Sequence, residues 1–250
     1  MKINPKIPQK NHNVSDESDS SIFFRYIGLF VAIIVLCYVF FISLSQVVVL
    51  FVSTQDEARF FWSGSLGSQL SSSPLPESLQ QRYSGIPYTI KVIDMDAENA
   101  FADLWGNIYI TQDLLDSMMY IEELDFIIGH ELSHVEDRHV LKWLISDVPI
   151  AIVLSLFGWE YSTTIFQGIL SNNYSKFHES SADRDGLDFT YELNGHVWCA
   201  LDFFREGDTL SENMLQIFST HPMTSHRIKR AEEYTEKMWY ETAECTKLTL

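Results

Sequence analysis

A His-Glu-x-x-His motif near the middle of the chain combines residue types that bind a metal ion and use it. His130 and His134 lie one turn apart if the segment is helical, so both imidazoles can reach one ion. Glu131 is offset from that face, close enough to touch a metal-bound water without being a ligand. Neutral imidazoles bind Zn²⁺, and a neighbouring carboxylate can take a proton from the water. The motif predicts zinc-dependent hydrolysis, although it is insufficient alone.

A catalytic zinc needs a third protein ligand and an open position for water. The three-histidine extension of the motif is excluded, because Asp137 replaces its glycine and its last histidine is absent. Glu179 is the better candidate, since Asp183 follows it at helical spacing and points the same way. One carboxylate can bind the metal while the other accepts the outer N–H of a ligand histidine. His178 points elsewhere on that helix and is not expected to be a ligand.

Several helices and few strands are expected to position these residues. Alternating apolar and polar residues predict strands over 88–93 and 107–111, joined by a connection over 94–106. Helices are predicted over 112–120, 122–140, 174–193 and 227–244. This pattern indicates a mostly helical α+β domain.

Residues 26–50 carry no formal charge and consist mainly of Val, Ile, Leu and Phe. At about 1.5 Å per residue, a helix of this length exceeds the roughly 30 Å hydrocarbon core of a bilayer. A buried core helix is one alternative, but such helices seldom run so apolar for so long. A cleaved signal peptide is another, although its apolar region is normally shorter. A retained transmembrane anchor is the favoured interpretation.

The charges beside this segment predict its orientation. Basic residues precede it at Lys2, Lys6, Lys10 and Arg25. Because only Arg59 follows closely, the positive-inside rule puts the N-terminus in the cytoplasm and the catalytic domain outside. The expected location is the periplasmic face of a bacterial inner membrane. Cys199 and Cys245 could pair in such an oxidising compartment, while free buried thiols are an equal alternative.

Composition and linkers suggest the remaining organisation. The expected parts are a disordered cytoplasmic tail (1–21), the transmembrane anchor (22–52), a Gly/Ser-rich linker (53–74) and a folded domain (75–250). Residues 148–159 are too short to span a bilayer, and a buried helical hairpin is favoured over an interfacial one. The net charge of −17 repels phosphate backbones, so no nucleic-acid partner is expected.

Several short motifs, taken in order, carry a family resemblance. They are Asn99-Ala100-Phe101, His130-Glu131-Leu132-Ser133-His134, Glu179-Ser180-Ser181-Ala182-Asp183, His221-Pro222 and Arg227-Ile228. The set resembles the M48 family of membrane-associated zinc metallopeptidases over roughly residues 75–235. The resemblance implies a zincin fold, with the motif helix beside a small sheet and a glutamate ligand from a second helix.

Roles follow from the resemblance by matching position. It implies one Zn²⁺ per chain, bound by His130, His134 and Glu179, with Glu131 as the general base. It also implies that His221 stabilises the oxyanion of the tetrahedral intermediate. The alternative for His221 is a structural loop residue held by the proline after it.

The resemblance implies three supporting residues as well. Asp183 would orient a ligand histidine, Arg227 would brace the site by an ion pair with a carboxylate such as Asp183, and Asn99 would hold substrate backbone. The alternative for Arg227 is a structural role at a helix start. An extended substrate could pair with the strand at 107–111, since backbone pairing tolerates varied sequences.

The expected function is that of a membrane-anchored zinc endopeptidase acting on membrane, envelope or misfolded proteins. The single clear membrane segment disfavours an intramembrane chamber of the prenyl-protease kind. A rival from another class is a catalytically weak metal-binding chaperone or adaptor with a peptide-binding groove. A structural membrane protein with an accidental motif is a further alternative. A non-haem iron site fits less well, because the motif glutamate has no role there. The oligomeric state is left open.

Overall fold

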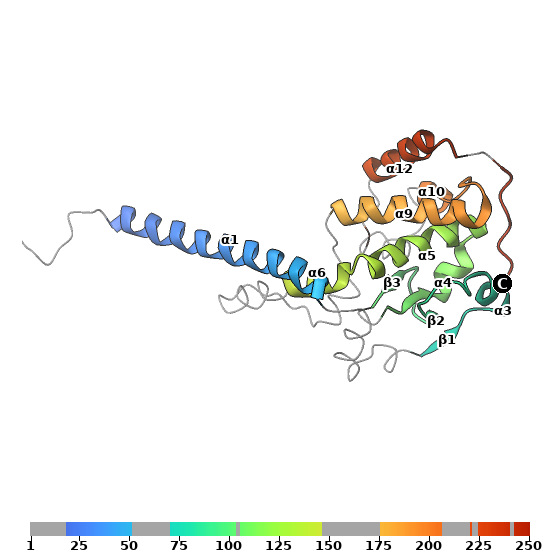
Figure 1. Cartoon of the computed structure of the whole chain (residues 1–250), viewed down its shortest axis with the longest axis horizontal. Helices are drawn as coiled ribbons and strands as arrows, with labels where there is room; N and C mark the ends of the chain where they lie inside the picture. The colour runs from blue at the N-terminus through green and yellow to red at the C-terminus, as the bar shows by residue number, and fades with distance from the viewer. Residues whose placement is uncertain are drawn as a thin grey trace, which may run out of the picture.

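The computed structural model describes residues 19–51, 71–103, 106–146, 176–206, 221, 225–240 and 243–250. It consists of a long N-terminal helix and a domain in which helices pack around a small sheet (Figure 1). The predicted mostly helical α+β class is confirmed. The predicted hairpin at 148–159 lies outside the described residues.

Helix α1 (Asp19–Phe51) extends away from the domain, and its C-terminal end packs against α6 (His139–Ser146) (Figure 1). The stretch Ser20–Phe51 is long and apolar enough to cross a membrane. Its most apolar window has none of its residues buried inside the protein, which excludes the core-helix alternative. The helix begins at Asp19, inside the segment predicted to be a disordered tail.

The sheet has four strands in the order β1-β2-β4-β3. Their bounds are Ser72–Pro74 for β1, Ile90–Ile93 for β2, Ala100–Ala102 for β3 and Ile108–Thr111 for β4. The central pair β2 and β4 is parallel, and both outer pairs are antiparallel. The two predicted strands are therefore confirmed. The segment predicted to be a connection contains β3, and β1 starts the sheet before residue 75.

The expectation that a substrate pairs with residues 107–111 is wrong. Strand β4 already has a partner on each side, since Ile108 aligns with Ile90 of β2 and with Ala102 of β3. Both of its hydrogen-bonding edges are used within the sheet. Among the described strands, β3 is the edge next to the motif helix.

Seven helices of the described chain follow β1. They are α3 (Glu77–Arg82), α4 (Gln112–Ser117), α5 (Ile121–Glu136), α6, α9 (Lys176–Asn194), α10 (Asp202–Glu206) and α12 (Ser225–Met238). Helix α4 is shorter than predicted. The helix predicted over 122–140 is two helices, because Arg138 has a left-handed backbone (φ 56°) between α5 and α6. Helix α12 also ends earlier than predicted, because Trp239, the residue after it, has a left-handed backbone (φ 57°).

Two glycines let α5 and α9 approach closely, and these helices share the most extensive contact in the domain. A Cβ on Gly186 would lie 2.8 Å from the carbonyl oxygen of Phe126. A Cβ on Gly129 would lie 2.7 Å from Cβ of Phe189. Both distances are shorter than carbon atoms tolerate. The small residues thus set the spacing between the helix of the motif and the helix that carries Glu179.

The C-terminal segment is tied to the start of α5. Cys199 and Cys245 form a disulfide, which answers the pairing that the sequence leaves open. The N–H of Thr246 donates to the buried carboxylate of Glu122, at 3.0 Å and 3.2 Å from its two oxygens. The N–H of Ile121 donates to the carbonyl of Thr246 at 2.9 Å. The disulfide therefore holds a strand-like segment against the first turn of the motif helix.

Candidate metal site

Four buried side chains bring metal-binding atoms to one place. His130 and His134 come from α5, and Glu179 comes from α9. His221 precedes α12 in the chain. One ligand atom from each lies within 4.8 Å of the others. The motif helix and the Glu179 helix thus meet as predicted, because the two glycines allow close packing.

The inward-facing atoms are well defined. Nε2 of His134 is 3.1 Å from Nε2 of His130, and Oε1 of Glu179 lies 3.6 Å from the former. Nδ1 of His221 is 3.3 Å from Nε2 of His130 and 3.2 Å from Oε1 of Glu179. Imidazole nitrogens and a carboxylate oxygen are the donor set that Zn²⁺ takes in hydrolytic sites. The residues present therefore fit a zinc ion.

Glu131 faces the same space without joining the cluster of inward-facing atoms. Its Oε1 is 3.2 Å from Nε2 of His221, while its buried Oε2 has no hydrogen bond among the described residues. Burial raises the pKa of Glu131, although the charges of His221 and His130 act to lower it. A buried carboxylate with an open acceptor and a raised pKa is suited to exchange a proton with a water.

His130 is held from behind by Asp183, whose Oδ1 is 3.2 Å from Nδ1 of the imidazole. Asp183 forms an ion pair with Arg227, the kind of pair that the sequence leads us to expect. Although burial acts in the other direction, hydrogen bonds from Arg227 and His130 lower the pKa of Asp183. The carboxylate is thus kept charged as an acceptor for Nδ1–H of His130, which leaves Nε2 for the metal.

The electrostatics of the inner groups favour a cation. Burial alone would lower the pKa of His130, but hydrogen bonds to Asp183 and Glu179 raise it to about 9. Burial opposes ionisation of Glu179, yet the charge of His221 and the hydrogen bond with His130 hold its pKa far below its usual range. Burial, together with the charges of His130 and His221, lowers the pKa of His134. The site therefore offers a charged carboxylate and one neutral imidazole.

Asn99 is fully buried and lies outside the cluster of ligand atoms. Its N–H donates to Oγ1 of Thr111 at 2.9 Å, and its carbonyl accepts from the N–H of Thr111 at the same distance. These bonds fix the start of β3 against the end of β4. Its suggested role in holding substrate stays a prediction.

Sequence reasoning missed His139, which contacts the ligand-type histidine His134 through their Nδ1 atoms, 2.9 Å apart. Burial, then the charges of His178 and Lys142, lower the pKa of His139 to about 3. His178 lies outside the cluster, as expected, and its ring stacks on His139 with centroids 4.0 Å apart. The only signal for this contact in the sequence is that a histidine follows shortly after the His-Glu-x-x-His motif.

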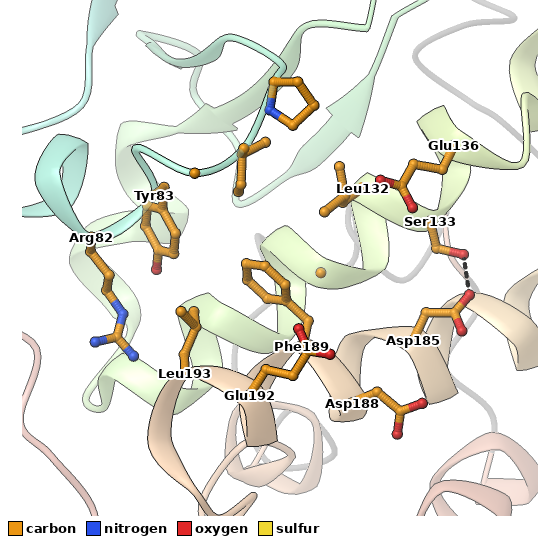
Figure 2. Close-up of a pocket in the computed structure, with 14 residues that line it drawn as sticks. Arg82, Tyr83, Leu132, Ser133, Glu136, Asp185, Asp188, Phe189, Glu192 and Leu193 are labelled. Atoms are coloured by element: carbon orange, nitrogen blue, oxygen red, sulfur yellow. Dashed lines mark hydrogen bonds between the residues drawn. The ribbon is translucent and has the colours of Figure 1, made fainter.

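A pocket of about 410 Å³ lies between α5, α9 and the turn after α3 (Figure 2). Its acidic lining residues are Glu136, Asp185, Asp188 and Glu192. Among the lining residues, Ser133 donates a hydrogen bond to Asp185 at 2.7 Å (Figure 2). None of the metal-site side chains lines it, because it lies on a different face of α5. It is therefore separate from the metal site.

Comparison of the chain with known proteins identifies its family. Residues 74–235 match the profile described as peptidase family M48. The chain belongs to peptidase family M48. The match covers strands β2, β3 and β4, helices α5 and α9 and most of α12, so it includes all four groups of the metal site. Within this M48 chain the two histidines and the glutamate of the metal site are intact.

Relatives of this M48 chain come from bacteria, archaea and animals. It is 23% identical over 170 residues to the mitochondrial metalloendopeptidase OMA1 of Danio rerio, covering 60% of this chain and 36% of the relative. It is 24% identical to a protease HtpX homolog of Thermococcus kodakarensis, covering 64% and 72% of the two chains. It is 24% identical to metalloprotease YcaL of Escherichia coli K12, covering 64% and 66%. The chain spans about a third of the length of the OMA1 relatives it matches.

Proposed function

We propose that this chain is a membrane-anchored zinc endopeptidase that holds one Zn²⁺ through His130, His134 and Glu179. The observation that carries the proposal is the convergence of these side chains from α5 and α9 on one buried point. A zinc ion bound there supplies a Lewis acid that polarises a carbonyl and makes its water more acidic.

Glu131 is the general base of the proposed reaction. It takes a proton from the attacking water and later returns it to the leaving amine. The assignment is supported by its burial, its raised pKa and the open acceptor at Oε2. A carboxylate whose pKa is raised toward neutral takes a proton from water more readily than an ordinary one.

His221 is the group that stabilises the oxyanion of the tetrahedral intermediate. Support comes from its position between Glu131 and Glu179, at 3.2 Å from an oxygen of each. An imidazole N–H at this place can donate a hydrogen bond to a developing negative charge. Keeping His221 off the metal would leave the open position that a catalytic zinc needs.

Asn99 and β3 are the proposed backbone-binding elements for substrate. Strand β3 is the edge of the described sheet beside α5, the helix that carries Glu131. An extended peptide added at that edge would run past the general base. Backbone pairing tolerates varied sequences, which suits a protease acting on membrane, envelope or misfolded proteins.

Helix α1 is the proposed membrane anchor, with the N-terminus inside and the peptidase domain outside. Its length and apolar composition support the anchor, and the basic residues before it support the orientation. The Cys199–Cys245 disulfide independently supports a peptidase domain outside the cytoplasm, since such bonds persist in oxidising compartments. A reporter fused to the C-terminus and active only outside the cytoplasm tests the orientation, and a cleaved N-terminus on the mature protein would refute the anchor.

The function is tested with the full chain in detergent, using unfolded casein as the substrate. We expect zinc-dependent cleavage that a chelator stops and added zinc restores. Glu131→Gln is expected to lower the rate by about 10²–10⁴-fold while zinc stays bound. The matched control is Glu136→Gln, an exposed acid of the same helix that should cleave normally.

Full cleavage by Glu131→Gln would refute the base assignment. If neither chain cuts casein and both protect it equally from aggregation, the chaperone alternative replaces the peptidase. If neither the wild type nor Glu131→Gln retains zinc, the His-Glu-x-x-His motif is accidental and the protein is not a zinc enzyme.

A further inference from the structure

His139, the first residue of α6, lies against the outer side of His134. Their Nδ1 atoms are 2.9 Å apart, and both rings are buried. Nε2 of His134 faces inward instead, 3.1 Å from Nε2 of His130. An imidazole that gives the lone pair of Nε2 to a metal carries its proton on Nδ1. That proton then points between the two rings, where Nδ1 of His139 is placed to accept it at 2.9 Å.

The surroundings of His139 suit an acceptor at Nδ1. Its Nε2 is 3.7 Å from a carboxylate oxygen of Asp137, which favours the ring proton on that side. His178 of α9 stacks on the ring, with an angle of 22° between the planes. The stacked neighbour limits rotation of His139, and its Nδ1 stays directed at His134.

We propose that His139 is a positioning residue of the metal site. By accepting the hydrogen bond from Nδ1–H of His134, it fixes the tautomer and the ring orientation in which His134 binds the metal. The inference rests on the proposed zinc site. His130 has the equivalent support from Asp183, at 3.2 Å from its Nδ1. The two ligand histidines are thus oriented by different acceptors, one a carboxylate and the other a neutral imidazole.

Helix α1 contributes to this arrangement through α6. Arg138 enters α6 with a left-handed backbone, and its Nη1 donates to the carbonyl oxygen of Val49 in α1 at 3.1 Å. The two helices share an apolar cluster that includes Val48, Val49, Val140 and Leu141. A non-glycine residue keeps this conformation only where its surroundings enforce it. The contact with α1 therefore holds the start of α6, and His139 with it, against the metal site.

The test measures the zinc dissociation constant of the full chain in detergent, by competition with a chromophoric chelator. His139→Leu fills the space without an acceptor and is expected to weaken zinc binding by about 10–100-fold. His139→Asn places Oδ1 near the position of Nδ1 and should restore most of the affinity. His226→Leu, at an exposed histidine of α12, is the control and should bind zinc like the wild type.

Unchanged zinc affinity in His139→Leu would overturn the proposal. If that variant does not fold, nitrogen NMR of the zinc-loaded wild type decides the matter. The proposal requires the ring proton of His139 on Nε2, and a proton on Nδ1 would contradict it. Absence of zinc binding by the wild-type chain would instead refute the proposed function, and this inference with it.

The contribution of α1 has its own variant. Leu141→Ala loosens the contact between α6 and α1, and it should weaken zinc binding in the same direction as His139→Leu. Val47→Ala removes an exposed side chain of α1 and should have no effect. Equal zinc affinity in these two variants would show that α1 does not support the site.

Discussion

Arg227 of α12 holds both carboxylate oxygens of Asp183, with hydrogen bonds of 2.9 Å from Nε and 2.6 Å from Nη2. The remaining nitrogen of the guanidinium lies 2.7 Å from Oε2 of Glu179. One buried cation thereby pairs with both Asp183, the carboxylate beside His130, and Glu179, the carboxylate of the metal site. This fork geometry is available to arginine and not to lysine.

Replacing Arg227 by Met should remove the cation that the buried carboxylates of Asp183 and Glu179 share. We expect a loss of about 3–5 kcal/mol in the free energy of unfolding. Zinc affinity should fall by about 10–100-fold as Asp183 loses its orientation. Thermal unfolding and chelator competition measure the two effects. Arg230→Met, at an exposed arginine of the same helix, is the control, and equal losses in both variants would contradict the assignment.

Gly186→Ala should push α9 away from α5. The added methyl group would meet the carbonyl oxygen of Phe126 at 2.8 Å and the N of His130 at 3.2 Å, and these backbone atoms cannot move without shifting the helix. We expect overpacking to cost about 1–3 kcal/mol in stability, with weaker zinc binding. Gly85→Ala has no atom within 4 Å of the new Cβ and should behave like the wild type. A fully stable Gly186→Ala chain would show that the helices are not in contact there.

Breaking the disulfide should loosen the C-terminal segment that docks on the first turn of α5. Cys199 and Cys245 are 46 residues apart, and a loop of that size corresponds to about 4 kcal/mol of stabilisation. Cys199→Ser should lower the melting temperature, and a reductant should lower that of the wild type but not of the variant. Cys37→Ser, at the exposed free cysteine of α1, serves as the comparison. A wild-type melting temperature insensitive to reductant would argue against the bond.

Zinc binding should strengthen as the pH rises. In the metal-free chain the pKa of His130 is raised to about 9 by its carboxylate partners, despite burial. Below that pH a metal has to displace a proton, and above it no proton remains to be displaced. Apparent zinc affinity should therefore rise by up to about tenfold per pH unit from near pH 7 and level off above pH 9. A profile that is flat over this range would mean that His130 is already neutral without metal.

Much of the site follows from local spacing. The motif puts His130 and His134 on one helical face, and the same rule pairs Glu179 with Asp183. Those inferences need only a helix, and both segments are helical. Only the family resemblance implies that His221 joins the metal site. No pattern in the sequence around His221 predicts that it lies beside α5.

Other parts of the fold are not marked by any pattern in the sequence. Strand β3 has three residues, Ala-Phe-Ala, all buried, so no alternation of apolar and polar side chains marks it. The break after α5 occurs at Arg138, where neither glycine nor proline signals a helix end. Missing that break also hid His139, which reaches His134 only because the chain turns between the two helices.

The central claim is that side chains from α5 and α9 hold one zinc ion. Anomalous scattering at the zinc edge from crystals of the metal-loaded chain tests it most directly. We predict a single peak about 2.0–2.2 Å from Nε2 of His130, Nε2 of His134 and a carboxylate oxygen of Glu179. No peak at that position, or a peak beyond reach of Glu179, would contradict the account.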